Sequence, residues 1–411
     1  MAEQKNLVPK RRFKEFQNTH AWKQRKLGEM SNSFEYGLNA SATFFDGINK
    51  YIRITDIDDN SRLFNQSALT SPDVDLSNAD NYLIKNGDIL FARTGASVGK
   101  TYRYQESDGK VYYAGFLIRA RINQDFDSEF VFQNTLTPKY DNFIKITSQR
   151  SGQPGVNAQE YASFALMVPT LEEQQKIGTF FKALDGTIAL HQRKLEKTKA
   201  LKSAYLSEMF PAEGEREPKR RFAGFTQAWE QRKLGEITDS FSGGTPSANN
   251  RDYYNGSIPF IRSGEINSNT TELFITEEAL NNSSAKLVTE GDILYALYGA
   301  TSGEVGISQI NGAINQAVLA IKPKFGDDSY LITQWLKKQK QTIIGTYLQG
   351  GQGNLSGSIV KNLMIDLPTN KEEQTKIGSF FKQFDETIAL HQRKLEKLQN
   401  IKKAYLNEMF V

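Results

Sequence analysis

Residues 172–210 read EEQQKIGTFFKALDGTIALHQRKLEKTKALKSAYLSEMF, and residues 372–410 read EEQTKIGSFFKQFDETIALHQRKLEKLQNIKKAYLNEMF, with 28 of 39 positions identical. A repeat at about half the chain length indicates a duplicated architecture. Each half has the order arm, globular region, long repeated segment. Weaker echoes support this halving: Pro9–Phe13 returns as Pro218–Phe222, Trp22–Glu29 as Trp229–Glu236, Tyr51–Arg53 as Phe260–Arg262, and Gly87–Leu90 as Gly291–Leu294.

The repeated segments have the signals of long helices. Thr170 to Glu173 forms a capping box with Thr170 at the N-cap, and Thr369 to Glu372 repeats the device. Prolines stand only outside the segments, before both and after the first. Apolar residues recur at the 4-3 spacing of a heptad seam. They are Ile177, Phe181, Leu184, Ile188, Leu195, Tyr205 and Met209, then Ile377, Phe381, Phe384, Ile388, Leu395, Leu398, Tyr405 and Met409.

About 40 residues at 1.5 Å each make a helix roughly 60 Å long. Its apolar stripe requires a partner, and the second helix has to run back if the two ends of the second globular region lie close together. We therefore predict an α+β protein with two globular α/β domains at opposite ends of a long antiparallel two-helix coiled coil, related by a pseudo-two-fold axis. The predicted boundaries are an arm at 1–19, domains at 20–169 and 229–368, helices at 170–210 and 369–411, and a linker with a second arm at 211–228.

The similarity between the halves is uneven. The helical segments are nearly identical, whereas the globular regions agree only at scattered framework positions. Two similar scaffolds that carry different surfaces suit a protein that recognises two different halves of a split target site. Plain gene duplication followed by neutral drift is the alternative, although drift alone would not spare one segment and scramble its neighbour.

Composition sets broad limits on the class of protein. The 411 residues suffice for two to three domains, and the absence of cysteine excludes disulfides and cysteine-ligated metals. The net charge of +4 is a weak basic bias, which leaves DNA binding by part of the surface open. No segment near Met1 resembles a signal peptide, and no apolar run would span a bilayer. We expect a soluble, cytoplasmic protein with no membrane association.

The sequence gives no positive support for catalysis. Residues 93–101 end like a phosphate-binding loop, but Thr94 stands where the first glycine belongs, and the matching loop has Glu304 in place of the lysine. No two prolines are adjacent, so the tetrapeptide of amino-methyltransferases is missing. His191 and His391 fall on the helical seam. A register-setting role is favoured there over a metal or catalytic pair, because no cluster of further ligands accompanies them.

Several motifs together resemble the specificity subunit of type I restriction–modification systems. Residues 242–247, SGGTPS, followed by 253–261, YYNGSIPFI, are similar to the opening of one class of target-recognition domain. Residues 46–57 resemble a different opening type, so the first domain is not expected to follow the second. The segments after Pro169 and Pro368 resemble the start of the family's conserved helices. The resemblance covers nearly the whole chain.

The resemblance implies a non-catalytic, sequence-specific DNA-binding subunit. Each target-recognition domain would read one half of a bipartite site in double-stranded DNA, and the helices would set the gap. Two modification subunits would methylate adenine with S-adenosylmethionine, and two restriction subunits would use ATP and Mg²⁺ for translocation and cleavage. None of these cofactors would bind this chain. The roughly 60 Å helices fit two domains on groove faces about one DNA turn, 34–36 Å, apart.

Base reading needs polar side chains on loops that enter a groove. The loops bordered by glycine at matching positions are the candidates, with ordinary surface solvation as the alternative. Arms at Lys10–Arg12 and Lys219–Arg221 could contact phosphate or the scaffold, or remain solvated. The predicted DNA-binding residues are Arg93, Thr94, Ser97, Lys100, Arg150, Ser151, Gln153 and Asn157, and Tyr298, Thr301, Ser302, Gln349, Gln352 and Asn354.

Three rival interpretations stay open from sequence. One is the specificity subunit of a related, type IIB-like restriction–modification system with the same scaffold. Another is a coiled-coil adaptor without a DNA role. The third is a methyltransferase or nuclease with an unrecognised site, which binding of S-adenosylmethionine or DNA cleavage with magnesium alone would reveal.

Overall fold

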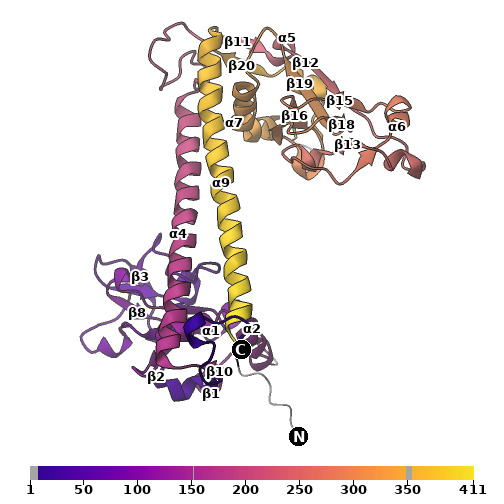
Figure 1. Ribbon diagram of the computed structural model, residues 1–411. Coiled ribbons are helices and arrows are strands. Elements are labelled where there is room, and N and C mark those ends of the chain that lie inside the picture. The colour runs from indigo at the N-terminus through magenta and orange to yellow at the C-terminus, as the bar shows by residue number, and fades with distance from the viewer. Residues whose placement is uncertain (1–7, 151, 349–353) are drawn as a thin grey trace. The chain divides into compact units, whose positions relative to one another are not determined.

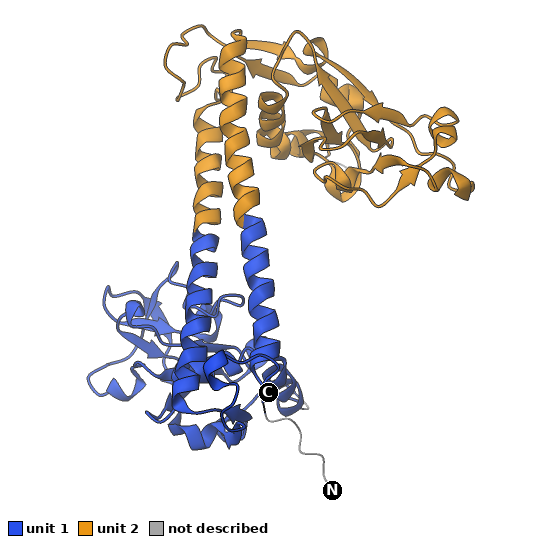
Figure 2. Ribbon diagram, viewed as in Figure 1, with its two compact units in different colours: residues 1–193, 392–411 blue, residues 194–391 orange. Residues whose placement is uncertain are grey.

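The computed structural model describes residues 8–150, 152–348 and 354–411. The chain divides into two compact units (Figure 2). Unit 1 comprises residues up to 193 together with 392–411, and unit 2 comprises residues 194–391. Each unit therefore combines one globular region with segments of both long helices, α4 (Leu171–Glu208) and α9 (Lys371–Met409).

The described residues of the globular region of unit 1 form mainly short strands, with helices near the end of the region; Figure 1 labels several of these elements. The strands are β1 (Lys23–Lys26), β2 (Ser31–Tyr36), β3 (Ala42–Phe44), β4 (Lys50–Ile52), β5 (Thr70–Pro72), β6 (Asp88–Ala92), β7 (Thr101–Arg103), β8 (Val111–Tyr113), β9 (Leu117–Ile122) and β10 (Ala165–Val168). The helices are α1 (Ser128–Asn134), α2 (Pro138–Thr147) and α3 (Ala158–Ala162).

The globular region of unit 2 follows the same plan. Its strands are β11 (Glu230–Lys233), β12 (Thr238–Ser242), β13 (Ile258–Ile261), β14 (Phe274–Ile275), β15 (Lys286–Val288), β16 (Ile293–Ala296), β17 (Val305–Ile307), β18 (Gly312–Ile314), β19 (Val318–Pro323) and β20 (Met364–Leu367). Its helices are α5 (Leu234–Ile237), α6 (Glu277–Asn281), α7 (Ser329–Tyr347) and α8 (Gly357–Lys361).

Both globular regions have the same central sheet. The antiparallel order is β2-β9-β6-β7 in unit 1 and β12-β19-β16-β17 in unit 2. Each also has one parallel pair, β4 with β8 and β13 with β18. The expectation that the first domain would not follow the second is therefore wrong for the central sheet. The difference lies beside it, where β3 pairs with β5 in unit 1, whereas β14 and β15 flank the parallel pair in unit 2.

The strands β6 and β16 carry the repeated Gly-Asp-Ile-Leu echo and are buried on both faces. In unit 1, Ile89 and Phe91 join the main core, while Leu90 and Ala92 join a second apolar cluster. Burial on both faces explains why these strands read as continuous apolar runs rather than as an alternation. Each main core also contains residues from the long helices and tryptophan, which is Trp22 in unit 1 and Trp229 and Trp335 in unit 2.

The long helices pair antiparallel within each unit. In unit 1, Asp185 of α4 binds Lys402 of α9 at 2.6 Å. In unit 2, Lys202 of α4 binds Asp385 of α9 at 2.6 Å. The two ion pairs join equivalent positions of the repeat, because the aspartate lies on α4 in unit 1 and on α9 in unit 2, and the lysine lies on the other helix. Edge-to-face rings repeat the relation, Phe180 with Tyr405 and Tyr205 with Phe380, both at 5.1 Å between centroids. The predicted antiparallel pairing of the two helices is therefore confirmed within each unit.

The helix starts differ in part from the predicted capping boxes. The Thr170 hydroxyl accepts the Glu173 N–H at 3.4 Å, as predicted. In the second copy the cap is Asn370, whose Oδ1 accepts the N–H groups of residues 372 and 373 at 2.8 and 3.3 Å. The prediction of Thr369 as N-cap is thus wrong by one residue. Its hydroxyl bonds the side chain of Gln227 instead.

The basic arms bind the helical scaffold. Arg12 donates two hydrogen bonds to the buried carboxylate of Glu173, at 2.7 and 2.6 Å. Arg221 binds Glu373 in the same way, at 2.6 and 2.8 Å. Glu173 is at N3 of the predicted first capping box, and Glu373 is at N3 when counted from the observed cap Asn370. In both copies arginine occupies both carboxylate oxygens. Of the three alternatives for the arms, the scaffold contact is the one found at Arg12 and Arg221.

Candidate nucleic-acid interface

The two loops singled out in the first half of the sequence lie against each other. We call residues 93–100 the glycine loop of unit 1 and residues 150–157 its second loop. Thr94 forms a β-bridge with Gly155. The Val156 N–H donates to the Arg93 carbonyl at 2.9 Å, and the Gly95 N–H donates to the Pro154 carbonyl at 3.0 Å. The structure therefore joins two segments that are about 60 residues apart in the sequence into one polar surface.

Unit 2 repeats this arrangement. Its glycine loop is residues 297–304, and its second loop includes residues 354 and 355. Tyr298 forms a β-bridge with Asn354, and the Leu355 N–H donates to the Leu297 carbonyl at 3.0 Å. The same backbone contact therefore occurs at matching places in both units, although the side chains differ.

Glycines determine the shape of the glycine loops. Gly95 and Gly99 have φ of 71° and 83°, and Gly299 and Gly303 have φ of 74° and 80°. This left-handed conformation strains residues with a side chain. The resemblance of residues 93–101 to a phosphate-binding loop therefore reflects a turn that unit 2 shares without the lysine.

Tyr161 holds the glycine loop of unit 1 in place. Its hydroxyl donates to the Ala92 carbonyl at 2.6 Å and accepts the Gly99 N–H at 3.1 Å. Burial raises the pKa of Tyr161 above its usual value, so the hydroxyl keeps its proton at every physiological pH. The loop is thus pinned at the end of β6 rather than free to rearrange.

Two of the predicted DNA-binding residues belong to the framework. Lys100 is buried, and its ammonium binds Asp59 at 2.5 Å and the Ile57 carbonyl at 3.1 Å. Ser302 is also buried, and its hydroxyl donates to the Leu297 carbonyl at 3.1 Å. Neither side chain is presented to a groove. Glu304, at the position of the expected lysine, binds Lys340 of α7.

The other described candidates remain at the surface or partly exposed. Arg93 lies over the ring of Tyr36, with its guanidinium carbon 4.9 Å from the ring centroid. Arg150 is exposed and binds Glu160 at 2.5 Å, and Asn157 caps α3. Gln153 and Asn354 are exposed, while Thr94, Ser97, Tyr298 and Thr301 are partly buried. Ser151, Gln349 and Gln352 lie outside the described residues.

A third element of the surface was missed from sequence. The turn between β8 and β9, residues 114–116, is closed by the Leu117 N–H to the Ala114 carbonyl at 2.8 Å, and Arg93 N–H donates to Phe116 carbonyl at 3.0 Å. The turn at 315–317 is its counterpart, with the Leu297 N–H donating to the Ala317 carbonyl at 2.8 Å. The Gly-Asp-Ile-Leu echo marks the central strands, but their neighbours β9 and β19 carry no comparable echo.

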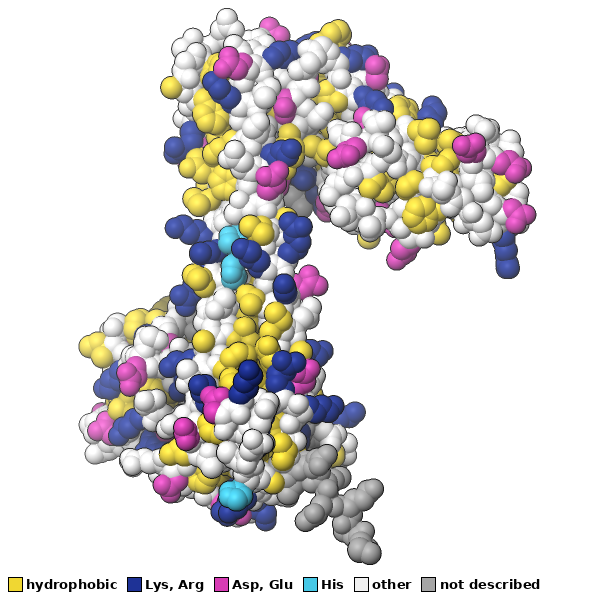
Figure 3. Space-filling model, in the orientation of Figure 1, with side chains coloured by type: hydrophobic (Ala, Val, Ile, Leu, Met, Phe, Trp, Pro, Cys, Tyr) yellow, Lys and Arg dark blue, Asp and Glu magenta, His cyan; other side chains and the backbone are white. Residues whose placement is uncertain are grey.

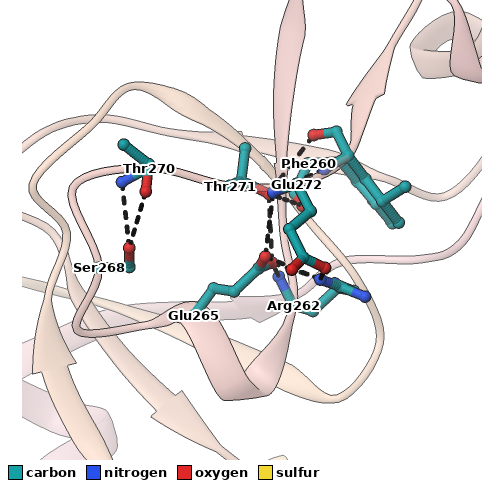
Figure 4. A network of polar contacts seen from close by, with 8 residues as sticks. Phe260, Arg262, Glu265, Ser268, Thr270, Thr271 and Glu272 are labelled. Carbon is teal, nitrogen blue, oxygen red and sulfur yellow. Dashed lines mark hydrogen bonds and ion pairs between the residues drawn. The ribbon is translucent and has the colours of Figure 1, made fainter. Parts of the chain in front are cut away.

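The echo of Tyr51–Arg53 at Phe260–Arg262 has a structural role. Figure 4 shows that Arg262, directly after β13, lies between the carboxylates of Glu265 and Glu272, at 2.8 Å from each. Thr271 completes this network by donating to the Phe260 carbonyl at 2.9 Å. In unit 1, Arg53 binds Asp56 at 2.8 Å in the same position. The repeated arginine therefore closes the turn after a strand in both units.

This network predicts a contribution to acid sensitivity. Arg262 lowers the pKa of Glu265 to about 2, below the ordinary value of 4.5. The stabilisation is fully present above pH 4.5 and is lost as the pH falls through about 2. We expect Glu265→Gln to destabilise unit 2 at pH 7, with a smaller difference from wild type at pH 2.5. Urea unfolding at the two pH values measures this, and an unchanged difference would contradict it.

Acidic and basic side chains are interspersed on the surface of both globular regions (Figure 3). Figure 3 shows lysine, arginine, aspartate and glutamate side chains scattered over both globular regions, with basic side chains frequent on the helix segments. Exposed examples on the helices are Arg193, Lys194 and Lys197 of α4 and Arg393, Lys394 and Lys397 of α9. The candidate loops are thus defined by geometry rather than by a uniform basic face.

The described part of the chain has neither a candidate metal site nor a candidate membrane span. No group of three or more histidines, aspartates or glutamates there could hold a metal ion. No helix there is both long and apolar enough to cross a membrane.

Comparisons with known proteins agree with the duplication. Residues 20–200 and 226–400 each match the family described as type I restriction modification DNA specificity domain. The type I restriction enzyme MjaVIII specificity subunit of Methanocaldococcus jannaschii is 21% identical over 345 residues, covering 79% of this chain and 78% of that one. The MjaIX specificity subunit of the same organism is 28% identical over 191 residues, 44% of each chain. The crystal structure of the type I system S subunit from M. genitalium superposes with a TM-score of 0.71 at 13% identity, over 98% of this chain and 99% of that one.

Proposed function

The chain belongs to the type I restriction modification DNA specificity family, and from this premise we propose that its two globular regions each read one half of a split DNA target. The chain is a specificity subunit, and catalysis belongs to the other subunits of such a system.

One observation carries this proposal. The glycine loop, the second loop and the turn before β9 or β19 share backbone hydrogen bonds in both units, but their side chains differ. A constant backbone gives both regions the same way of approaching a groove. Different side chains then give different base contacts, because sequence is read by groups that reach base edges.

We assign the base and phosphate contacts to the exposed and partly exposed members of this surface. In unit 1 these are Arg93, Thr94, Ser97, Arg150, Gln153 and Asn157, and in unit 2 they are Tyr298, Thr301 and Asn354. The assignment drops Lys100 and Ser302, since both are buried. Ser151, Gln349 and Gln352 stay predictions for the undescribed parts of the same loops.

The helical repeats are the proposed seat of the partner subunits. Their ion pairs and ring contacts repeat with the two copies exchanged, so two similar surfaces are available for two modification subunits carrying S-adenosylmethionine. Two similar surfaces can bind two copies of the same partner. Two restriction subunits, with ATP and Mg²⁺, complete the proposed complex.

The proposal predicts a bipartite methylation motif. The chain is expressed with its modification subunits in cells that lack other adenine methylation, and the methylated positions are read by direct sequencing of the genome. We expect two short specified words separated by a gap of unspecified bases. A single unbroken word would contradict a split target.

A domain exchange assigns each half. Replacing residues 20–168 with the corresponding region of another member of the family should change one word and leave the other word unaltered. Replacing residues 229–368 is the matched experiment and should change only the other word. A change in both words after either exchange would contradict independent reading by the two regions.

A further inference from the structure

The turn at residues 114–116 carries an exposed aromatic side chain that no assigned role explains. Phe116 is 59% exposed, although it stands directly before the buried strand β9. The turn is closed by the hydrogen bond from Leu117 to Ala114, and the carbonyl of Phe116 accepts the Arg93 N–H. The backbone that holds this ring is therefore fixed on two sides.

The neighbours of Phe116 are also chemically suited to nucleic acid. Arg93 follows β6 directly and lies over the ring of Tyr36, at the end of β2. Tyr36 is 44% exposed, and its hydroxyl accepts the Ala158 N–H at 3.3 Å. A guanidinium stacked on an aromatic face keeps its outward donors available while its position is restrained. One aromatic ring, that of Tyr36, thus positions the Arg93 cation, and a second, exposed ring belongs to Phe116, whose carbonyl accepts the Arg93 N–H.

Unit 2 has the matching backbone but not the side chains of Tyr36, Arg93 and Phe116. The strand registers and the matching hydrogen bonds place Ser242, Leu297 and Ala317 where unit 1 has Tyr36, Arg93 and Phe116. The turn there offers the exposed Gln316, whose amide oxygen accepts the Thr245 hydroxyl at 2.6 Å. The polar chemistry of unit 2 suits reading base edges, whereas an aromatic ring recognises the faces of bases.

The faces of bases in a duplex are covered by their neighbours. An apolar side chain reaches them only by entering a base step and partly unstacking it, which kinks the DNA. We propose that Phe116 enters a base step of the half-site read by unit 1, while Arg93, held by Tyr36, binds the DNA beside the opened step. Unit 2 reads its half-site without such an insertion. This inference rests on the proposed function.

Fluorescence of 2-aminopurine tests the insertion, because the signal of this base rises when stacking is lost. The full chain is assembled with its modification subunits on duplexes that carry the genome-derived motif, with 2-aminopurine at successive positions of each half-site. The methylated adenine itself is left unlabelled, since displacement there belongs to the partner's chemistry. We expect a several-fold rise at one step in the half-site that changes when residues 20–168 are exchanged, and no rise in the other.

Variants at position 116 identify the side chain responsible. Phe116→Ala should abolish the rise and weaken binding of the duplex by at least about five-fold, since stacking of one base on an aromatic ring contributes that much or more. Phe116→Trp should retain both. Phe44→Ala removes a phenylalanine that is 95% exposed on β3 of the same unit and should change neither.

The outcomes separate the two proposals. Specific binding and a split motif with no fluorescence rise, or a rise that Phe116→Ala leaves intact, would overturn the insertion and leave the proposed function standing. Loss of the rise in Phe44→Ala as well would also overturn the assignment to Phe116. A motif that does not change on exchange of residues 20–168 would refute the proposed function itself, and the insertion with it.

Discussion

Replacing Arg12 with alanine will lower the free energy of unfolding of unit 1 by about 3–5 kcal/mol, the usual cost of breaking a buried ion pair. The side chains of Arg12 and Glu173 are 5% and 0% exposed, so the substitution leaves a carboxylate buried without its partner. Arg12 also donates to the Thr19 and His20 carbonyls, which ties the arm to itself. Hydrogen exchange of the β6 and β9 amides reports the stability of unit 1 separately from that of unit 2.

The neighbouring arginine supplies the control. Arg11 binds Glu408 at 2.5 Å, but the two side chains are 55% and 37% exposed. An exposed ion pair contributes about 0–1 kcal/mol, so Arg11→Ala should have a small effect. Equal losses from the two variants would show that burial of the carboxylate is not what makes the Arg12 contact strong. Arg221→Ala should reproduce the large effect in unit 2, where Glu373 is 0% exposed.

Gly178→Ala should destabilise unit 1 by about 1–3 kcal/mol despite the better helix propensity of alanine. Gly178 lies where α4 meets the start of α1. An added Cβ would overlap Oδ1 of Asp127 and lie 3.1 Å from the Cβ of Glu129. That oxygen accepts the Phe130 N–H at 2.7 Å and caps α1, so displacing it also weakens the cap.

Gly186→Ala is the matched control in the same helix. No atom lies within 4 Å of a Cβ added there, and the residue is exposed. Alanine should therefore stabilise α4 by about 0.5–1 kcal/mol. The two substitutions are chemically identical and are predicted to have opposite signs. Thermal unfolding and hydrogen exchange of α1 and α4 measure both, and a stabilised Gly178→Ala would contradict the close approach of α1.

Much of this architecture could be predicted from the sequence because it is duplicated. The helical repeat fixes the length and the antiparallel pairing of α4 and α9, and the scattered echoes proved to be framework positions. Gly87 and Gly291, for example, have φ of 91° and 93° at the start of the shared central strand. Residues that recur while their surroundings change are those that the backbone requires.

The surface loops were less predictable. The glycine pattern located the glycine loops, but it could not distinguish exposed from buried positions within them, so Lys100 and Ser302 were assigned to DNA contact. The ammonium of Lys100 binds Asp59 and the Ile57 carbonyl, which come from a distant part of the sequence. The turn at Phe116 was missed because its place beside Arg93 follows from strand pairing, which no local pattern reveals. The position of the second helix cap was missed because threonine and asparagine both suit it.

The core of unit 1 also has a consequence for synthesis of the chain on the ribosome. Phe130 and Phe181 contact Phe410, with ring centroids 5.4 and 5.6 Å apart, and Leu406 and Met409 belong to the same cluster. The globular region of unit 1, which is translated first, therefore completes its core only with residues that are translated about 200 positions later. At roughly 5–20 residues per second, the nascent lobe waits on the order of ten seconds or more with part of its apolar interior uncovered. We expect chaperones to bind this region during that interval. We also expect unit 2, which ends at residue 391 and contains segments of both long helices, to complete its core first.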